Sequence, residues 1–370
     1  MGEQVALKWY EKTGQGGDVA VSTRVRLARN LCREVFPGRA SAEQKVRVAR
    51  QVRDALLDGN SVLAGSFRFL PLEELSPGAA ASLAERHLIS PAFAAGGPGR
   101  AVLVSEDESI CVMVNEEDHV RIQVLREGLA LEEAAEAADR MDTLLGERLE
   151  FAYDRAFGYL TQCPTNLGTG MRASLMLHLP GLAEAGSLPR LAANLSKLGL
   201  TLRGAFGEGS RAVGEMVQLS NQITLGLSEN QAIENLAAIA GQLMGEERRI
   251  RAGIGKDPAW QDKICRAAGI LRSARLMSAG EAAQLLSLAR LGVALGLLEG
   301  MEPGEIDGLL VKVQPATLAE GAGKPLEEAQ RDARRAGLLR AACGGLEAAY
   351  AYLPDRSDRN NGRDGPARRL

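Results

Sequence analysis

A short segment of the chain combines a thiol, a turn-forming proline, an amide and two glycines. It reads Cys163-Pro164-Thr165-Asn166-Leu167-Gly168-Thr169 and continues directly with Gly170-Met171-Arg172. Pro164 favours a turn, and glycine lets the backbone pass close to a bound molecule. A nearby cation such as Arg172 favours the thiolate form of Cys163. These residue types on one loop indicate a reactive site rather than packing.

Five arginines, spread over four motifs, could bind phosphate groups. They are Arg24, Arg26, Arg121, Arg172 and Arg203. A single guanidinium group can bind two phosphate oxygens at once, and it stays charged at any working pH. The sequence has no Walker A motif, because Gly321-Ala322-Gly323-Lys324 has the wrong spacing, and it has no protein-kinase catalytic motif. An arginine cage is therefore the expected phosphate site, although each arginine taken alone could be a solvated surface charge.

The motifs resemble, in type and in order, those of the phosphagen (ATP:guanidino) kinases, which phosphorylate a guanidinium nitrogen. The matching segments are residues 22–30, 115–122, 163–169, 203–209, 218–221 and 225–229. The resemblance implies ATP as the phosphoryl donor, with Mg²⁺ held through ATP and no metal site of the protein's own. It also implies an antiparallel sheet flanked by helices.

The same resemblance implies catalytic roles for three residues. Glu117 would orient the guanidinium and accept its proton, and Cys163 would steer the guanidinium as a thiolate. Glu208 would be a second carboxylate on a mobile glycine-rich loop. Glu116, on an extended backbone, is expected to point away from its neighbour. Nucleophilic catalysis by Cys163 is the alternative, but the family transfers phosphate directly.

The ATP-binding residues are also implied by the resemblance. They are Ser22, Thr23, Arg24, Val25, Arg26, His87, Arg121, Arg172, Ala173, Ser174, Leu175, Met176, Arg203, Gly204, Ala205, Phe206, Gly207 and Glu208. The matching segment around His87 is short, so a partly buried helix histidine is the alternative interpretation at that position.

A second resemblance narrows the family to the bacterial protein-arginine kinases. The chain reaches Ser22 almost at once, so the N-terminal helical domain of metabolic phosphagen kinases is expected to be missing. The string Arg331-Asp332-Ala333-Arg334-Arg335-Ala336 resembles a motif associated with allosteric phosphoarginine binding. On a helix, Arg331 and Arg335 could reach one phosphate while Asp332 holds the guanidinium, and Ala336 completes the motif. The alternative is a solvated, charged helix face.

This resemblance implies phosphorylation of arginine side chains in proteins, a homodimer, and a role in stress-linked protein quality control. Phosphoarginine would mark substrates for a Clp-type protease and inactivate a heat-shock repressor, and an activator protein is a further expected partner. Two other functions remain open. One is a kinase of free arginine or another small guanidine, and the other is a non-catalytic phosphoarginine-binding adaptor.

Composition limits the remaining function classes. Of the 370 residues, 45% are hydrophobic and 25% charged, and the net charge is −3, which favours neither nucleic acid nor anionic membrane as a partner. No apolar run approaches the length of a membrane span, and no secretory signal is recognised. The five cysteines are scattered without a Cys-x-x-Cys pair, and the three histidines lack ligand spacing. We therefore expect a cytoplasmic protein without disulfides or a transition-metal site.

Hydrophobic periodicity predicts an α+β domain followed by an all-α domain. Helices are expected over residues 41–58, 131–149, 187–198 and 228–249, and strands over 101–104, 110–114 and 119–125. The later helices are expected over 258–276, 279–299, 303–313 and 325–352. Four of the expected helices should be capped at their N-termini by a serine, namely Ser41, Ser187, Ser228 and Ser278. The expected units are a catalytic domain at 1–255, a helical domain for dimerisation and phosphoarginine binding at 256–352, and a disordered tail at 353–370.

Overall fold

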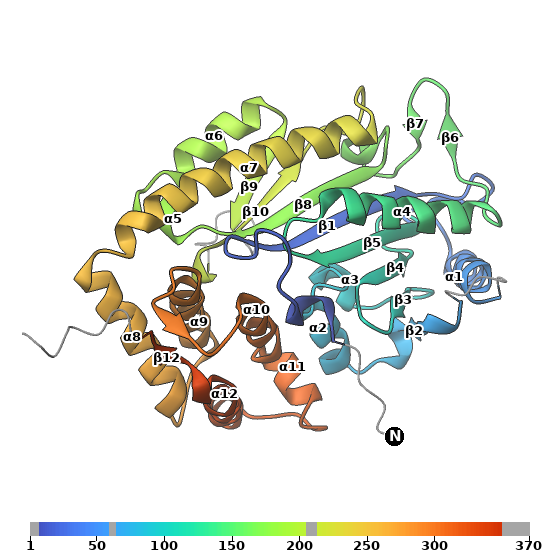
Figure 1. The fold of residues 1–370 in the computed structure, drawn as a ribbon. Helices are drawn as coiled ribbons and strands as arrows, with labels where there is room; N and C mark the ends of the chain where they lie inside the picture. Colours follow the sequence, from blue (N-terminus) through green and yellow to red (C-terminus); the bar gives the residue numbers. More distant parts are fainter. Residues whose placement is uncertain (1–6, 59–63, 205–212, 350–370) are drawn as a thin grey trace, which may run out of the picture.

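An eight-stranded antiparallel sheet forms the centre of the fold (Figure 1). The computed structural model describes residues 7–58, 64–204 and 213–349. The predicted site residues at 205–208, the end of the last predicted helix and the predicted tail at 353–370 lie outside the described residues. The strand order is β2-β3-β4-β5-β1-β8-β10-β9, so β1 lies in the interior of the sheet between β5 and β8.

The strands are β1 (Ala20–Arg29), β2 (Phe67–Pro71), β3 (Ala101–Ser105), β4 (Ile110–Val114), β5 (Val120–Glu127), β8 (Met171–His178), β9 (Leu200–Gly204) and β10 (Met216–Asn221). The predicted hairpin at 101–114 is confirmed, with Val104 of β3 opposite Cys111 of β4. The predicted third strand is also confirmed and continues to Glu127. A separate small hairpin consists of β6 (Tyr153–Asp154) and β7 (Gly158–Tyr159).

The helices of this part are α1 (Ala42–Leu57), α2 (Pro77–Glu85), α3 (Pro91–Ala94), α4 (Leu131–Gly146), α5 (Pro180–Glu184), α6 (Leu188–Lys197) and α7 (Glu229–Ile254). Two predicted N-caps are confirmed: Ser41 Oγ accepts the Gln44 N–H, and Ser228 Oγ accepts the Gln231 N–H, each at 3.2 Å. Ser187 also precedes a helix, but its own backbone is helical and its side chain makes no capping bond.

Side-chain alternation gives the sheet two different faces. Val25 and Leu27 of β1 face a large apolar core that includes α1, α4, α6 and α7. The opposite face is apolar only toward the β2 edge, where α2 and α3 pack against Val102 and Met113. Figure 1 shows α4 and α7 on one side of the sheet and α2 and α3 on the other. Beyond that edge, the second face carries the serine and arginine side chains of β1 and β8.

The C-terminal helices, α8–α12, have an apolar core of their own. They are α8 (Pro258–Ser273), α9 (Ala279–Ala294), α10 (Pro303–Lys312), α11 (Pro315–Glu320) and α12 (Glu328–Ala342). This core begins at Ile254, the last residue of α7, and ends at Leu346. The helical character predicted for this region is confirmed. Within the ranges that the structure describes, no helix is long and apolar enough to span a membrane.

Two of the later predictions were wrong in their boundaries. The helix predicted over 279–299 ends at Ala294, because Gly296 adopts a positive φ of 67° and turns the chain into β11 (Leu298–Glu299). The helix predicted over 325–352 is α12, which stops at Ala342 so that β12 (Glu347–Ala348) can pair with β11. The short helix α11, which begins at Pro315, was not predicted.

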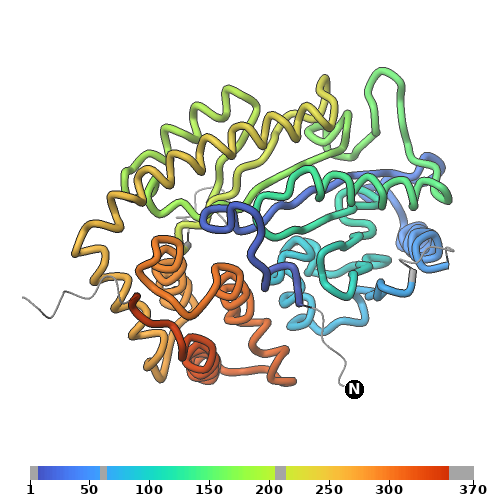
Figure 2. Tube along the Cα trace, in the orientation of Figure 1, coloured from blue at the N-terminus to red at the C-terminus, as the bar shows by residue number. Residues whose placement is uncertain are grey.

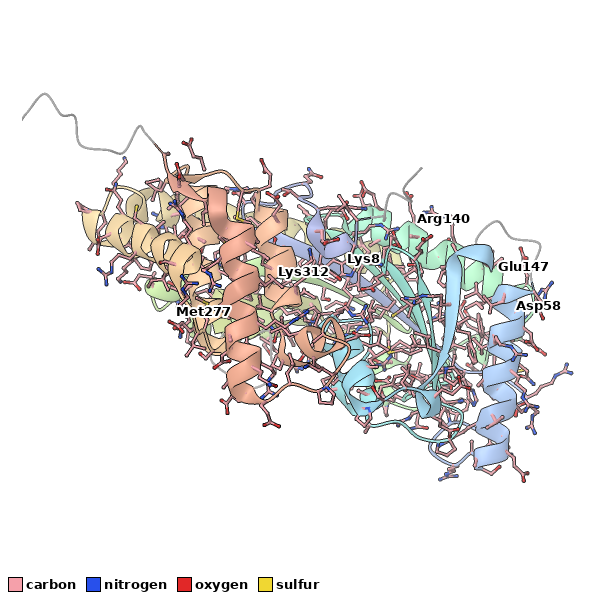
Figure 3. All side chains as sticks on the ribbon, turned by 90° about the horizontal axis from the view of Figure 1, so that it is seen from below. Lys8, Asp58, Arg140, Glu147, Met277 and Lys312 are labelled. Carbon is pink, nitrogen blue, oxygen red and sulfur yellow. The ribbon has the colours of Figure 1, made fainter. Side chains whose placement is uncertain are left out.

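The N-terminal segment joins the C-terminal helices to the sheet. Figure 2 shows this dark blue segment passing beside the orange helices, and its turn η1 (Trp9–Glu11) packs on α10. A Cβ atom on Gly304 would lie 2.3 Å from the Lys12 carbonyl carbon, so only glycine permits this approach. An ion pair between Lys312 and Glu11 closes the contact, and Figure 3 shows Lys312 beside Lys8 at this junction.

Candidate active site

Arginine side chains gather on this second face of the sheet. Strand pairing places Arg26 of β1 directly opposite Arg172 of β8. Arg24, two residues earlier on β1, projects from the same face, and Ala28 pairs with Arg121 of β5. Directly paired residues of antiparallel strands project to one face. Three separate sequence motifs therefore supply cations to a single surface.

The fifth predicted arginine joins this surface from β9. Arg203 pairs with Gln218 of β10, and Arg24 Nη2 donates a hydrogen bond of 2.8 Å to Gln218 Oε1. Burial lowers the pKa of Arg172, and the nearby Arg203 lowers it further. The structure thus brings together all five arginines that the sequence motifs predicted. We call this set the arginine cluster.

Burial and mutual repulsion make the arginine cluster electrostatically unfavourable by itself. Burial, together with Arg172 and Arg121, lowers the pKa of Arg24 to about 10. Burial and the same neighbours, with Arg24 added, lower the pKa of Arg26 well below its usual value. Among the described residues, the buried Nε atoms of Arg26 and Arg172 have no hydrogen-bond partner. Buried, unpaired donors of this kind fit an anion with several oxygens, such as a phosphate chain.

His87 lies at the edge of the arginine cluster, in the turn after α2. Its backbone is left-handed, with a φ of 62°, and its carbonyl accepts a 2.9 Å hydrogen bond from Gln123 Nε2 on β5. Burial and the nearby Arg24 lower its pKa to about 4, so its imidazole is neutral at physiological pH. The predicted position of His87 near the phosphate-binding arginines is consistent with these contacts.

The two neighbouring glutamates both contact Arg121. Arg121 Nη2 donates to Glu117 at 3.0 Å, and Arg121 Nη1 forms an ion pair with Glu116. The expectation that Glu116 points away was wrong, because residues 115–119 form a bend rather than a strand and Asn115 has a positive φ of 58°. Glu116 also accepts from Ser90 Oγ at 2.9 Å. The Glu117 side chain is 40% exposed, against 12% for Glu116, which leaves Glu117 the more accessible carboxylate.

A buried polar clamp that sequence reasoning missed holds this bend against the cysteine loop. Asn30 Nδ2 donates to Asp118 Oδ1 at 2.6 Å and to the Leu160 carbonyl at 3.0 Å. The Gln162 N–H donates to the same Asp118 oxygen at 2.7 Å, and the His119 N–H donates to Asn30 Oδ1 at 2.9 Å. The segments carrying Glu117 and Cys163 are thereby tied to the end of β1. Burial raises the pKa of Asp118.

Cys163 begins the turn η4 (Pro164–Asn166), as the proline in the sequence predicted. Its Sγ lies 3.0 Å from Thr165 Oγ1. Cys163 is also near enough to Arg172 to influence the pKa of the Arg172 guanidinium. The loop is held from behind by Thr224, whose Oγ1 donates to the Thr165 carbonyl at 3.0 Å. Gly168 is required there, since a Cβ atom would lie 2.2 Å from the Thr224 carbonyl oxygen.

Arg29 is a sixth arginine on these strands, but its partners make it structural. Arg29 is 1% exposed and bonds to Asp142 of α4, with an Nη2–Oδ2 distance of 2.8 Å. Its guanidinium carbon lies 3.4 Å from the centre of the Tyr159 ring, and Nη1 donates to the Thr169 carbonyl at 3.0 Å. Arg29 therefore anchors the far end of the cysteine loop to α4.

Comparisons with known proteins agree with this geometry. Residues 47–250 match the model of the ATP:guanido phosphotransferase C-terminal catalytic domain, and residues 258–351 match that of the protein-arginine kinase McsB C-terminal domain. The protein-arginine kinase of Moorella thermoacetica is 44% identical over 336 residues, which covers 90% of this chain and 96% of that protein. That of Geobacillus stearothermophilus is 42% identical over 334 residues, covering 90% and 92%.

The chain belongs to the protein-arginine kinase family. Two solved structures share its fold. A lombricine kinase has a TM-score of 0.57 and 24% identity, covering 66% of this chain and 71% of that chain. The duplicated taurocyamine kinase from Schistosoma mansoni, with bound transition state analog components, has a TM-score of 0.56 and 28% identity, covering 66% and 35%. The match to the phosphotransferase family identifies this chain as a phosphotransferase enzyme.

The other residues predicted to bind ATP divide between the two faces of the sheet. Ser22, Ser174 and Met176 share the face of the arginine cluster, since Ser22 pairs with Met176 and Ser174 lies opposite Arg24. The side chains of Val25, Ala173 and Leu175 lie in the main core instead, and Thr23 Oγ1 donates to the Gly128 carbonyl at 2.7 Å. These four residues can act on a ligand only through the strand they shape. Gly204 ends β9, and residues 205–208 lie outside the described ranges.

The predicted phosphoarginine motif of this kinase lies on α12, but its residues are not equally available. Arg335 is 1% exposed, and its guanidinium donates to the Val313 carbonyl at 2.9 Å and the Met277 carbonyl at 2.8 Å. It also donates to Asp332 at 2.6 Å. Figure 3 marks Met277 near α12. The expectation that Arg331 and Arg335 both reach outward to one phosphate does not fit this arrangement.

Of the four residues predicted to bind phosphoarginine, Arg331 and Asp332 remain partly accessible. Arg331 Nη1 donates to the Leu326 carbonyl at 2.7 Å, a bond within its own segment. The Asp332 side chain is 26% exposed beyond its contact with Arg335. Ala336 is buried in the core of the C-terminal helices. The motif therefore combines two packing residues with two side chains that can meet a ligand.

Proposed function

We propose that this kinase transfers the terminal phosphoryl group of Mg-ATP to the guanidinium group of arginine side chains in proteins. The observation that carries the proposal is the pair of buried Nε atoms on Arg26 and Arg172, which lie in a cluster of five arginines and have no partner within the described ranges. Such an arrangement gains most when an anion with many oxygens occupies it. The similarity of this chain to protein-arginine kinases supports protein arginine as the acceptor.

Two neighbouring regions would carry out the proposed reaction, one binding the phosphate chain and the other binding the acceptor guanidinium. The arginine cluster would hold the phosphate chain and neutralise charge as it develops on the transferring group. Mg²⁺, bound through the phosphate oxygens, would supply further charge neutralisation. Glu117 would fix the acceptor guanidinium and take its proton. Cys163, on the adjoining loop, would add a second negative contact to that guanidinium, and Glu208 would add a third from outside the described ranges.

We also propose a regulatory setting for this activity, in line with the resemblance to bacterial protein-arginine kinases. Residues 1–255 would form the catalytic domain, and residues 256–352 would mediate dimerisation and bind phosphoarginine through Arg331 and Asp332. In the cytoplasm, the products would be directed to a Clp-type protease, and a heat-shock repressor would be among the substrates. An activator protein is part of the same proposal. The match of residues 258–351 to the McsB C-terminal domain supports this assignment.

Mapping of the product tests the proposal directly. The chain is incubated with Mg-ATP carrying a labelled terminal phosphate, an arginine-rich protein and, in a parallel reaction, free arginine. Phosphosites are then mapped under non-acidic conditions, because the phosphorus–nitrogen bond is acid-sensitive. Label on protein arginine supports the proposal. Label on free arginine alone would support the other candidate, a kinase for small guanidines, which the structural similarity to lombricine and taurocyamine kinases keeps open.

A further inference from the structure

The last residue of α2 connects the catalytic sheet to the C-terminal helices. The carboxylate of Glu85 accepts the backbone N–H groups of Ala316 and Thr317, at 2.9 and 2.7 Å. It also accepts the Thr317 hydroxyl at 2.8 Å. All three donors lie in the first turn of α11, and the Thr317 hydroxyl also lies 3.3 Å from Ser82 Oγ of α2. One carboxylate therefore docks α11 onto the end of α2.

The next residue, Arg86, strengthens the same junction. It forms an ion pair with the buried Glu108 in the turn between β3 and β4. Arg86 Nη2 also lies 3.5 Å from Glu320, the last residue of α11. Both ends of α11 are thus fastened to consecutive residues of the catalytic part. These contacts lie directly before the turn that follows α2.

That turn carries His87 to the arginine cluster. His87 is the left-handed residue that ends α2: its N–H donates to the Ala84 carbonyl, and the Leu88 N–H donates to the Leu83 carbonyl, each at 3.0 Å. Its carbonyl and that of Leu88 accept hydrogen bonds from Gln123 Nε2, at 2.9 and 3.2 Å. Gln123 is the cross-strand partner of Arg26. A continuous set of contacts therefore runs from α11 through the turn to Gln123, which lies opposite Arg26. The His87 imidazole is buried and close enough to Arg24 for that cation to help lower its pKa.

We propose that Glu85 is a positioning residue for nucleotide binding, acting through His87. By holding α11, Glu85 fixes the end of α2 and the turn that keeps the imidazole beside Arg24. The inference rests on the proposed nucleotide site at the arginine cluster. It goes further because it makes nucleotide affinity depend on the C-terminal helices, which supply no residue to that cluster. Any event that moves α11 would then change the affinity for ATP.

Direct binding measurements on the full chain test this inference. Titration calorimetry gives the Kd for Mg-ATP of the wild type, of Glu85→Gln and of Thr317→Val, which changes the opposite side of the junction. We expect each variant to raise Kd about fivefold or more, the usual range for coupled sites. Glu74→Gln is the matched control, because Glu74 is an exposed glutamate just before α2 and should leave Kd unchanged.

A double-mutant cycle separates positioning from simple stabilisation. In a His87→Asn background, where asparagine tolerates the left-handed backbone, Glu85→Gln should raise Kd little further. The inference is overturned by a Kd equal to that of the wild type, even with a lowered Tm, and equally by fully additive effects in the cycle. Failure of the wild type to bind Mg-ATP would instead contradict the proposed function itself.

Discussion

Arg26 of β1 and Arg172 of β8 are directly opposed across two neighbouring strands, and the buried Nε atom of each has no partner among the residues that the structure describes. Like charges in directly opposed positions destabilise a sheet. The fold therefore keeps an unfavourable pair at its centre, where a hydrophobic pair would be more stable. A pair of residues that lowers the stability of the free protein is typical of a binding site. An anion placed between the two guanidinium groups would replace their mutual repulsion by attraction of both groups to the anion.

Replacing Arg26 by methionine should stabilise the free protein and weaken nucleotide binding. Methionine fills similar space without the charge, so Tm should rise by a few degrees in the absence of ligand, as expected for about 1 kcal/mol. The Kd for Mg-ATP should rise roughly 10- to 100-fold, since a charged hydrogen bond contributes about 1.5–3 kcal/mol. Thermal unfolding and calorimetry measure both effects. A lower Tm combined with unchanged affinity would contradict an anion-binding role.

Glu117→Gln should remove most of the phosphoryl transfer while leaving ATP binding intact. Glutamine can hydrogen-bond to a guanidinium but cannot accept its proton, so kcat should fall by about a hundredfold or more. Glu116→Gln is the matched control. Glu116 is less exposed and is held by both Ser90 and Arg121, so its replacement should lower Tm more than it lowers kcat. Initial rates with a protein substrate, together with Tm, distinguish the two. Near-normal turnover of Glu117→Gln would remove it from the mechanism.

The family motifs predicted the chemistry of the site better than its supporting contacts. The five arginines could be named because phosphate binding requires that residue type, and strand pairing then brought them to one face. Asn30 and Asp118 escaped attention because a buried amide–carboxylate clamp has no spacing signal of its own. Arg29, although adjacent to the predicted motif, could be separated from the ligand-binding arginines only once its contacts with Asp142 and Tyr159 were visible.

Local signals predicted where helices begin better than where they end. Ser41, Ser228 and Ser278 each accept a hydrogen bond from the residue three positions later, as their spacing indicated. The ends of α9 and α12 depend instead on the pairing of β11 with β12, a contact between segments nearly 50 residues apart. The expectation that Glu116 points away from Glu117 was wrong for a similar reason. The bend at 115–119 is imposed by tertiary hydrogen bonds to Asn30.

Cys163 should be the cysteine that alkylates first. Cys111 and Cys343 are buried, and burial raises their pKa values to about 12 and about 11. Cys163 lies beside Arg172 on the candidate site, while Cys265 is exposed on α8 and provides the matched control. Mass spectrometry after brief treatment with limiting iodoacetamide should find label at Cys163 before Cys265. Mg-ATP with a protein substrate should slow that labelling. Equal labelling of the two would contradict an activated thiol.

Changes to the α12 motif should separate ligand binding from packing. Replacing Arg331 and Asp332 together by alanine should abolish phosphoarginine binding and flatten any activation by it, with little change in the Kd for Mg-ATP. Arg335→Ala should instead unfold the protein at lower temperature, because it leaves the Met277 and Val313 carbonyls without their buried donor. Calorimetry with phosphoarginine and thermal unfolding provide the two readouts. Equal phosphoarginine affinity in the double variant and the wild type would return Arg331 and Asp332 to a charged helix surface.

Acidification should lower the free energy of unfolding of this protein through His178. This fully buried histidine lies at the end of β8, where Nε2 is 2.8 Å from Ser287 Oγ of α9 and Nδ1 is 3.2 Å from Arg251 Nη2 of α7. Burial, then Arg290 and Arg251, lower its pKa well below the usual 6.5. The unfolded chain therefore binds a proton near pH 6.5 while the folded chain does not, so this contribution to stability is lost as the pH falls below that value.

The test compares the wild type with His178→Gln by urea unfolding at pH 7.5 and pH 5.5. Over this interval, the histidine alone should cost the wild type about 1 kcal/mol of its free energy of unfolding. His178→Gln should be the less stable protein at pH 7.5, because its hydrogen bonds to Ser287 and Arg251 are imperfect replacements. Its free energy of unfolding should nevertheless fall less on acidification, so the difference between the two proteins narrows. A difference that stays constant from pH 7.5 to 5.5 would mean that His178 takes up its proton equally in the folded and unfolded states.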